Sequence, residues 1–184
     1  KIAQILSMVP DMLPQEYSDE LLTLQSNAPS MGWLFVKRRM KAELGADWES
    51  RFQKFSHEAI SAASLGQVHQ AQDLNGNLLA CKLQYPDMTS AVEADLAQLK
   101  LFLGLYSKAS GAIDTQNLYQ EISERLYEEL NYKLEADHIR LFQTVFQGQN
   151  YVHVPEVYPE LSTSRLLTMS WLPGQKLLAY KDAP

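Results

Sequence analysis

Apolar residues recur at helical spacing in the first part of the chain, and the pattern then changes. Over residues 1 to about 54 they fall in short runs between polar residues, as in amphipathic helices. The clearest run is Met31–Leu44, for which Ser30 is the expected N-cap and Gly45 occupies the usual position of a C′ glycine. We therefore expect short helices over residues 1–54.

The next segment predicts a β-hairpin. Two short extended runs, Gly66–Ala71 and Leu78–Leu83, flank the polar stretch Asp73–Asn77. Asn-Gly between two such runs is a strong hairpin signal, because both residues tolerate the positive φ that a tight turn requires. The sequence thus indicates an antiparallel pair of strands.

Helical spacing returns between residues 85 and 148. Ser90–Glu93 has the pattern of a capping box, so a helix is expected to begin there. After a break at Gly111, one long helix is predicted, because aliphatic residues occupy every fourth position: Leu118, Ile122, Leu126, Leu130 and Leu134.

Two more strand-like runs, Tyr151–Val154 and Arg165–Met169, lie near the end of the chain, with Pro155 and Pro159 between them. They predict a second antiparallel hairpin. Helices, a hairpin, helices and another hairpin together indicate an α+β fold built on a small antiparallel sheet.

Composition narrows the classes of function. The chain has 184 residues and a net charge of −6, which disfavours nucleic acid as a partner. No stretch approaches the roughly 18 apolar residues of a membrane-spanning helix. Its single cysteine, Cys81, cannot form an internal disulfide, so a reducing compartment is expected. The chain opens on Lys1 and stops at Pro184, and we expect it to be a fragment of a longer protein.

The four histidines show no spacing typical of a metal site, either with one another or with Cys81: His57, His69, His138 and His153. We therefore expect structural or solvated histidines and assign no metal ligand.

One constellation suggests nucleotide chemistry. Protein kinases place Gly-x-Gly-x-x-Gly-x-Val at the head of a hairpin whose second strand ends in Ala-x-Lys. Here Ser61–Val68 occupies the loop position, and an Ala-x-Lys sequence ends at Lys82. Gly66 matches the last glycine, whereas Ser61 and Ala63 stand at the first two. Backbone amides of such a loop cover phosphates, and a lysine on a rigid strand neutralises them.

The loop alone would be a weak signal, since an alanine-rich turn is more often only the tight start of a hairpin. We expect it to be a short, rigid turn in which Gly66 is best able to adopt φ > 0. Lys82 also needs a helical carboxylate. Glu129 and Glu135 are the candidates, about 120° apart on a single helix, although most helical glutamates are merely solvated.

The run Thr168–Gly174 has the pattern of a strand that leads into a lobe-connecting hinge. On this interpretation the Ser170 carbonyl and the Leu172 amide would bind adenine, and Met169 would be the gatekeeper.

These motifs together resemble the UbiB/ADCK (aarF-type) family of atypical protein-kinase-like proteins, over essentially the whole chain. The matching segments are the Lys-x-Gly-Gln-like start Lys1–Gln4, the alanine-rich loop Ser61–His69, the lysine strand Ala80–Pro86 and the Glu-x-Asp-like helix Glu129–Ala136. Two residues depart from the family pattern: Ala3 replaces a glycine and Asn131 replaces an acidic residue.

The resemblance implies a kinase-like N-lobe with extra N-terminal and inserted helices. Lys82 and Glu135 would form the ion pair on the phosphates, and Lys1 and Gln4 would meet Glu129, beside Asn131, as a lid over the site. The implied nucleotide-binding residues are Ser61, Ala62, Ala63, Ser64, Leu65, Gly66, Gln67, Val68, Lys82, Met169, Ser170 and Leu172. The cofactor would be ATP, with Mg²⁺ held by residues beyond Pro184.

The family is associated with ubiquinone biosynthesis, lipid membranes and ATP hydrolysis. The resemblance therefore implies an ATPase or atypical kinase that supports isoprenoid-lipid metabolism, with quinone-biosynthesis proteins or a membrane surface as partners. Its location would be cytoplasmic or peripheral at the inner face of a membrane.

We divide the chain into a helical extension, 1–54, and an N-lobe, 55–184. The alternatives are a pseudokinase-like module that binds lipid or protein, and a helical interaction domain whose likeness to kinases is coincidental.

Overall fold

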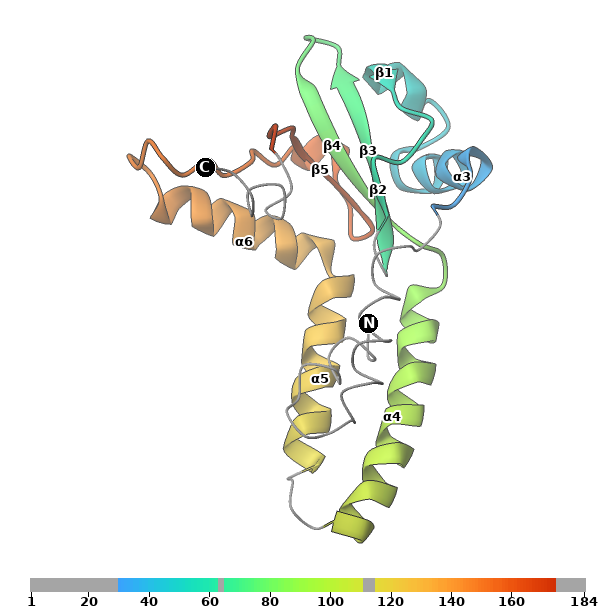
Figure 1. The fold of residues 1–184 in the computed structure, drawn as a ribbon. Coiled ribbons are helices and arrows are strands. Elements are labelled where there is room, and N and C mark those ends of the chain that lie inside the picture. Colours follow the sequence, from blue (N-terminus) through green and yellow to red (C-terminus); the bar gives the residue numbers. More distant parts are fainter. Residues whose placement is uncertain (1–29, 63–64, 111–114, 175–184) are drawn as a thin grey trace, which may run out of the picture.

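A five-stranded antiparallel sheet organises the fold (Figure 1). The computed structural model describes residues 30–62, 65–110 and 115–174. The strands are β1 Phe52–Phe55, β2 Ser61–Ala62, β3 Gly66–Asp73, β4 Leu78–Gln84 and β5 Leu166–Ser170. Along the sheet the order is β1-β3-β4-β5, and the short β2 also pairs with β3. The α+β prediction with a small antiparallel sheet is confirmed.

The predicted β3–β4 hairpin is present. Gly76 in its turn has φ +90, the left-handed conformation that glycine adopts without steric cost. The Asp73 carboxylate accepts hydrogen bonds from the backbone amides of Asn75 and Asn77, at 2.9 and 2.8 Å. These contacts fix a register in which Val68 lies opposite Lys82.

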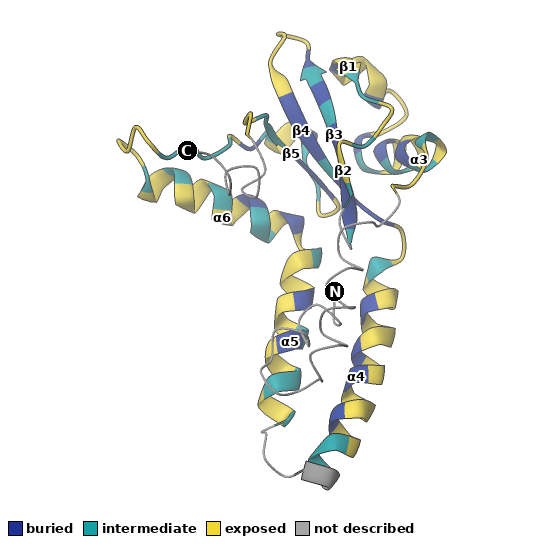
Figure 2. Cartoon of the chain, in the orientation of Figure 1, coloured by how far each residue is buried: buried dark blue, intermediate teal, exposed yellow. Residues whose placement is uncertain are grey.

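Helices cover both faces of the sheet. Helix α3, Trp33–Leu44, contributes Val36, Met40 and Leu44 to a core shared with Leu79 and Leu83 of β4. Figure 2 shows buried residues on both α3 and β4. A short 3₁₀ helix, Trp48–Arg51, connects α3 to β1.

The other face receives α6, Tyr132–Val145. Its Tyr132 and Ala136 pack against Val157 and against Leu167 of β5. Because side chains alternate along a strand, β4 presents Lys82 to this face and Cys81 and Leu83 to the core under α3.

Two long helices, α4 Met88–Ser110 and α5 Thr115–Leu130, extend from the sheet as an antiparallel pair (Figure 1). They have a core of their own, made of aliphatic side chains that face the partner helix: Val92, Leu96, Leu99, Leu103, Ile122 and Leu126. No helix in the described part of the chain is both long enough and apolar enough to span a membrane.

Two predicted helix starts are wrong. Helix α3 begins at Trp33 with Gly32 at the N-cap, and no side chain caps it, so Ser30 is not the cap. Helix α4 begins at Met88 rather than at Ser90. The turn after β4 puts Asp87 at φ 54, and the Asp87 carbonyl already accepts from the Ala91 amide at 3.0 Å. The helix has therefore already begun before Ser90.

The predicted end of α3 at Gly45 is confirmed. Gly45 has φ 96, and its amide is hydrogen-bonded to the Lys41 carbonyl.

The single long helix predicted over Leu118–Leu134 is also wrong, because the chain bends at Asn131. Asn131 has φ −100 and ψ 86, outside the helical region, and its side chain accepts a hydrogen bond from the Leu134 amide at 3.2 Å. Asparagine competes with helix in this way by satisfying a free amide at a helix start. The continuous apolar spacing is thus divided between α5 and α6.

The strand assignments differ at both ends of the sheet. Residues 52–54, predicted as helical, belong instead to β1, because the backbone of this strand pairs with the edge of β3. Tyr151–Val154 is not a strand. Instead a single bridge joins Val157 to Met169, beside Pro155 and the 3₁₀ turn Pro159–Leu161. Proline has no amide hydrogen to donate to a strand ladder, so Pro155 and Pro159 disfavour a regular second hairpin.

The predicted division of the chain at residue 54 falls within β1 and stays a prediction.

Candidate nucleotide site

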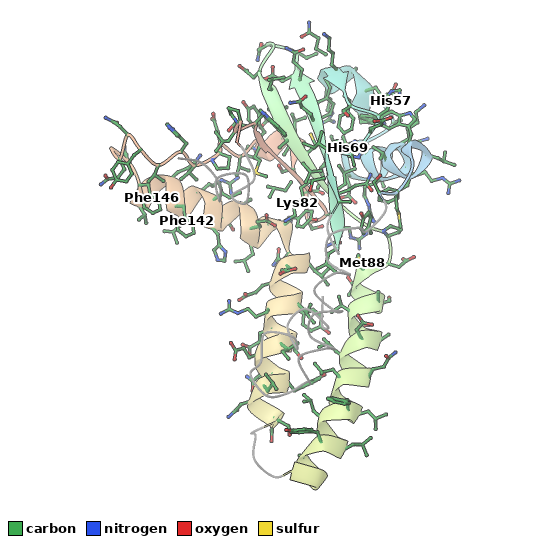
Figure 3. The ribbon with its side chains drawn as sticks, viewed as in Figure 1. His57, His69, Lys82, Met88, Phe142 and Phe146 are labelled. Carbon is green, nitrogen blue, oxygen red and sulfur yellow. The ribbon has the colours of Figure 1, made fainter. Side chains whose placement is uncertain are left out.

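Lys82 and Glu135 meet directly. The Lys82 ammonium donates to both carboxylate oxygens of Glu135, at 2.8 and 2.7 Å. Their side chains are 29% and 34% exposed, so the pair is only partly shielded from water. Figure 3 shows Lys82 at the junction of the sheet and the start of α6. The predicted contact between these residues is confirmed, and their role on phosphates stays a prediction.

The bend at Asn131 places Glu135. Glu135 lies in the first turn of α6, and its amide bonds to the Asn131 carbonyl at 3.1 Å. A carboxylate is favoured near a helix N-terminus, where free amide groups carry partial positive charge. Glu129 belongs to the preceding helix, so the two glutamates are separated by a change of helix direction rather than by rotation about one axis.

Tyr132 lies beneath the ion pair. The Lys82 ammonium is 4.8 Å from the centre of the Tyr132 ring, within cation–π range. Tyr132 is 1% exposed, and its hydroxyl has no hydrogen-bond partner in the part of the chain that the structure describes. Burial raises the pKa of the Tyr132 phenol, and the carboxylates of Glu135 and Glu129 raise it further.

Gly66 is required for close approach rather than for an unusual φ. Gly66 is the first residue of β3 and is not among the positive-φ glycines, so it does not use the conformation that we expected it to be best able to adopt. A β-carbon at Gly66 would lie 2.4 Å from the Leu83 carbonyl oxygen and 2.8 Å from the Tyr132 hydroxyl. The space is already filled, and only glycine fits.

The alanine-rich loop is partly described. Ser61 and Ala62 form β2 and pair with Val68 and Gln67. Ala63 and Ser64 lie outside the described residues, as do Lys1 and Gln4. Leu65 is half-buried against the core of α4 and α5, and its carbonyl accepts from the Tyr85 amide at 3.0 Å.

The Gln67 side chain points away from Lys82. Gln67 is fully buried and bonds to both backbone groups of Met31, accepting from its amide at 2.7 Å and donating to its carbonyl at 3.1 Å. Its amide also contacts the His69 ring at 2.8 Å. The structure thus uses Gln67 to hold the chain ahead of α3 against β3.

The predicted hinge residues lie one strand away from Lys82. Met169 pairs with Ala80, and side-chain alternation puts it on the sheet face of Lys82 and Val68. The Ser170 hydroxyl accepts from the Glu156 amide at 2.9 Å, and Leu172 follows the strand at 43% exposure. None of the three lines the cavity beside Lys82. Their contacts with adenine stay a prediction.

A cavity of about 510 Å³ opens where the base of the loop meets α5 and α6. It is lined by Leu65, Gly66, Lys82, Arg125, Glu128, Glu129, Tyr132, Leu134, Glu135 and His138. The motif did not single out Arg125, Glu128 and His138. Arg125 lies three residues before Glu128, and His138 lies three residues after Glu135; this helical spacing is the signal that could have found them. The described residues contain no group of three carboxylate, histidine or cysteine side chains that could hold a metal ion.

A buried-strand lysine held by a helical carboxylate, beside a glycine-based loop, defines the class of protein kinase-like N-lobes. The sequence model of the ABC1 atypical kinase-like domain matches residues 23–183. The chain belongs to this ABC1 atypical kinase-like family.

Individual relatives agree with the family assignment. The chain is 36% identical to the chloroplastic protein ACTIVITY OF BC1 COMPLEX KINASE 7 of Arabidopsis thaliana, over 96% of this chain and 26% of the relative. It is 30% identical to the mitochondrial atypical kinase COQ8 of Saccharomyces cerevisiae, over 100% of this chain and 37% of COQ8.

A solved structure shares the fold. The structure of Rv3197 from Mycobacterium tuberculosis in complex with erythromycin superposes with a TM-score of 0.68 at 32% identity. The match covers 95% of this chain and 44% of Rv3197. The chain thus spans less than half the length of each of these three relatives.

Proposed function

We propose that this chain is the nucleotide-binding N-lobe of a UbiB-like atypical kinase or ATPase. The observation that carries the proposal is the paired hydrogen bond from Lys82 to the Glu135 carboxylate, at 2.8 and 2.7 Å. A lysine fixed on a strand by a carboxylate can place its charge on the phosphates of ATP without a reorganisation at the moment of reaction. ATP would supply the phosphoryl group.

The sheet face around Lys82 suits the rest of the nucleotide. Val68, Ala80 and Met169 share that face by strand alternation, and apolar side chains of this kind pack on an adenine ring. The hinge roles of the Ser170 carbonyl and the Leu172 amide belong to the same proposal. The 184 residues by themselves are expected to bind ATP weakly, because half of the cleft wall would come from a second lobe.

The family resemblance supports the finer parts of the proposal. Ubiquinone or other isoprenoid-lipid metabolism would be the setting, with a membrane surface or quinone-biosynthesis proteins as partners and a peripheral location at the membrane. Lys1 and Gln4 would meet Glu129 in the cavity beside the ion pair and exclude protein substrates.

Calorimetric titration of ATP into the protein at the full length of its relatives tests the core of the proposal. Lys82→Gln is expected to weaken ATP affinity at least about tenfold, since one charge-assisted contact to phosphate is lost. Lys54→Gln is the control, because Lys54 is an exposed lysine on β1. Equal affinity in the Lys82→Gln variant and the wild type would contradict the proposal.

Turnover distinguishes the alternative that remains. A full-length protein that binds ATP through Lys82 but neither hydrolyses it nor transfers phosphate would be a pseudokinase-like binding module. Hydrolysis that disappears in both Lys82→Gln and Glu135→Gln variants would establish the enzyme.

A further inference from the structure

We propose that Tyr132 is a positioning residue, whose ring holds the Lys82 ammonium against Glu135 and keeps it aimed at the nucleotide. The inference rests on the proposed function for its effect on ATP. Its structural part concerns Lys82 alone and can be measured separately.

The Tyr132 ring gives the Lys82 ammonium a second contact, in addition to the Glu135 carboxylate. Glu135 contacts the Lys82 nitrogen at 2.7 Å from one direction, and the Tyr132 ring lies 4.8 Å from it in another. Lysine has a long flexible side chain, and one ion pair that is still partly open to water seldom fixes such a chain. A second contact with an aromatic face limits its positions, because the ammonium is attracted to the ring as well.

Tyr132 itself has little freedom to move. It is the first residue of α6, is 1% exposed and packs with Ala136, Val157 and Leu167. Leu167 is also the strand partner of Lys82 across the sheet. The ring is thus held between α6, which also carries Glu135, and β5, which pairs with the strand that carries Lys82.

The same side chain touches the base of the alanine-rich loop. A β-carbon built on Gly66 would be 2.8 Å from the Tyr132 hydroxyl. Tyr132 therefore lies between the loop and the lysine. Any shift of its ring would change its contacts with both Gly66 and Lys82. The hydroxyl has no hydrogen-bond partner among the described residues, so the ring rather than the hydroxyl carries the contact.

Tyr85 offers a matched control. It is also buried, at 7% exposure, and its hydroxyl likewise has no partner among the described residues. Its ring, however, packs 6.1 Å from that of Phe35 in α3, and the ring recorded over the Lys82 ammonium is that of Tyr132. A Tyr85 variant loses a buried ring without losing the contact with Lys82.

The experiment measures proton chemical shifts of the Lys82 ε-methylene group, assigned by their loss in Lys82→Gln. In the wild type these signals are expected upfield of an ordinary lysine, because they lie near an aromatic face. Tyr132→Phe should keep the displacement, Tyr132→Met should abolish it, and Tyr85→Met should leave it unchanged. Ordinary Lys82 shifts in the wild type would overturn the inference even if the Tyr132→Met variant failed to fold.

ATP affinity of the same variants at full length is the second measurement. Tyr132→Met is expected to bind ATP about fivefold to tenfold more weakly, as for loss of one cation–π contact. Tyr132→Phe and Tyr85→Met should bind like the wild type. An equal loss in Tyr132→Phe and Tyr132→Met, or in Tyr85→Met, would overturn the positioning role.

The two proposals fail in different ways. If the wild type does not bind ATP, the proposed function fails, and the methylene shifts still decide whether Tyr132 positions Lys82. If the wild type binds ATP and Tyr132→Met binds equally well, the positioning role fails and the proposed function stands.

Discussion

The sheet with its covering helices α3 and α6 differs from the helical pair α4–α5 in what each interior contains. The interior of the sheet region includes buried polar side chains, each with a hydrogen bond: Gln67, His69 and Thr168. The core of the helical pair consists of aliphatic side chains. The sheet also joins strands far apart in sequence, whereas α4 and α5 are neighbours along the chain.

This difference indicates where chemistry can be placed. A polar group can be held in a defined position only where several elements constrain it, and the sheet region supplies them around Lys82. The helical pair ends where α6 begins, and Leu65 packs against its core. Its outer side carries exposed apolar residues at Leu101, Phe102 and Leu105, and no described element covers them.

The largest expected effect compares one leucine from each core. Leu83→Ala, at a fully buried site between the sheet and α3, should destabilise the protein by about 3–5 kcal/mol. Leu103→Ala should cost about 2–3 kcal/mol, since two helices can close over a cavity more easily than a sheet can. Urea unfolding measures both, and the reverse order would remove the contrast between the two regions.

A pair of glycine substitutions should change stability in opposite directions. Gly66→Ala is expected to cost about 2–3 kcal/mol, because its methyl group would collide with the Leu83 carbonyl. Gly104→Ala, in the middle of α4 with open space around it, should stabilise the protein by about 0.5–1 kcal/mol. Thermal melting decides, and a stabilised Gly66→Ala would show that the loop base is not closely packed.

The junction between the two regions can be tested at Asn131. Asn131→Ala removes the cap of α6 and should cost about 1 kcal/mol. Asn131→Asp keeps a capping oxygen and should stay within about 0.5 kcal/mol of the wild type. If both variants unfold at the wild-type urea concentration, the side-chain cap does not stabilise the bend.

The smallest expected difference is in pH dependence. Burial lowers the pKa of His69, and the hydrogen bond to the Ser56 carbonyl offsets this only in part. Below about pH 6.5 the unfolded chain takes up a proton that the folded chain resists, so stability should fall as the pH decreases from there. Urea midpoints at pH 7.5 and 5.0 should differ more in the wild type than in His69→Gln. An equal difference would show that His69 contributes nothing to the acid sensitivity of the sheet.

Several parts of the structure could be predicted from local sequence. The Asn75-Gly76 turn, the β3–β4 hairpin and the end of α3 at Gly45 were predicted from turn and capping residues. The pairing of Lys82 with Glu135 was predicted too, but from the resemblance to the UbiB/ADCK family, since motif and spacing left both Glu129 and Glu135 as candidates. The three cavity residues Arg125, Glu128 and His138 had only helical spacing to mark them.

The wrong predictions have a common cause. Apolar residues at every fourth position through Leu130 and Leu134 favour one helix. In the structure the members of this series on α5 face the core shared with α4, whereas Leu134 of α6 lines the cavity, and α6 packs on the sheet through Tyr132 and Ala136. Ser90 resembles a cap, but the turn at Asp87 after β4 starts the helix earlier. In each case a neighbouring element decided between two locally acceptable structures.

The sequence by itself determined the features that depend on a few adjacent residues: which segments are amphipathic, where glycine permits a turn, and that a lysine lies near the end of a strand. The tertiary structure decided the features that depend on distant partners. It made β1 a strand by pairing with β3, and bent the chain at Asn131 so that Glu135 reaches Lys82. It also placed the Tyr132 ring beneath the ammonium. The physical reason is that turn and capping energies act within about four residues, whereas backbone pairing and burial act between segments whose contact no local pattern records.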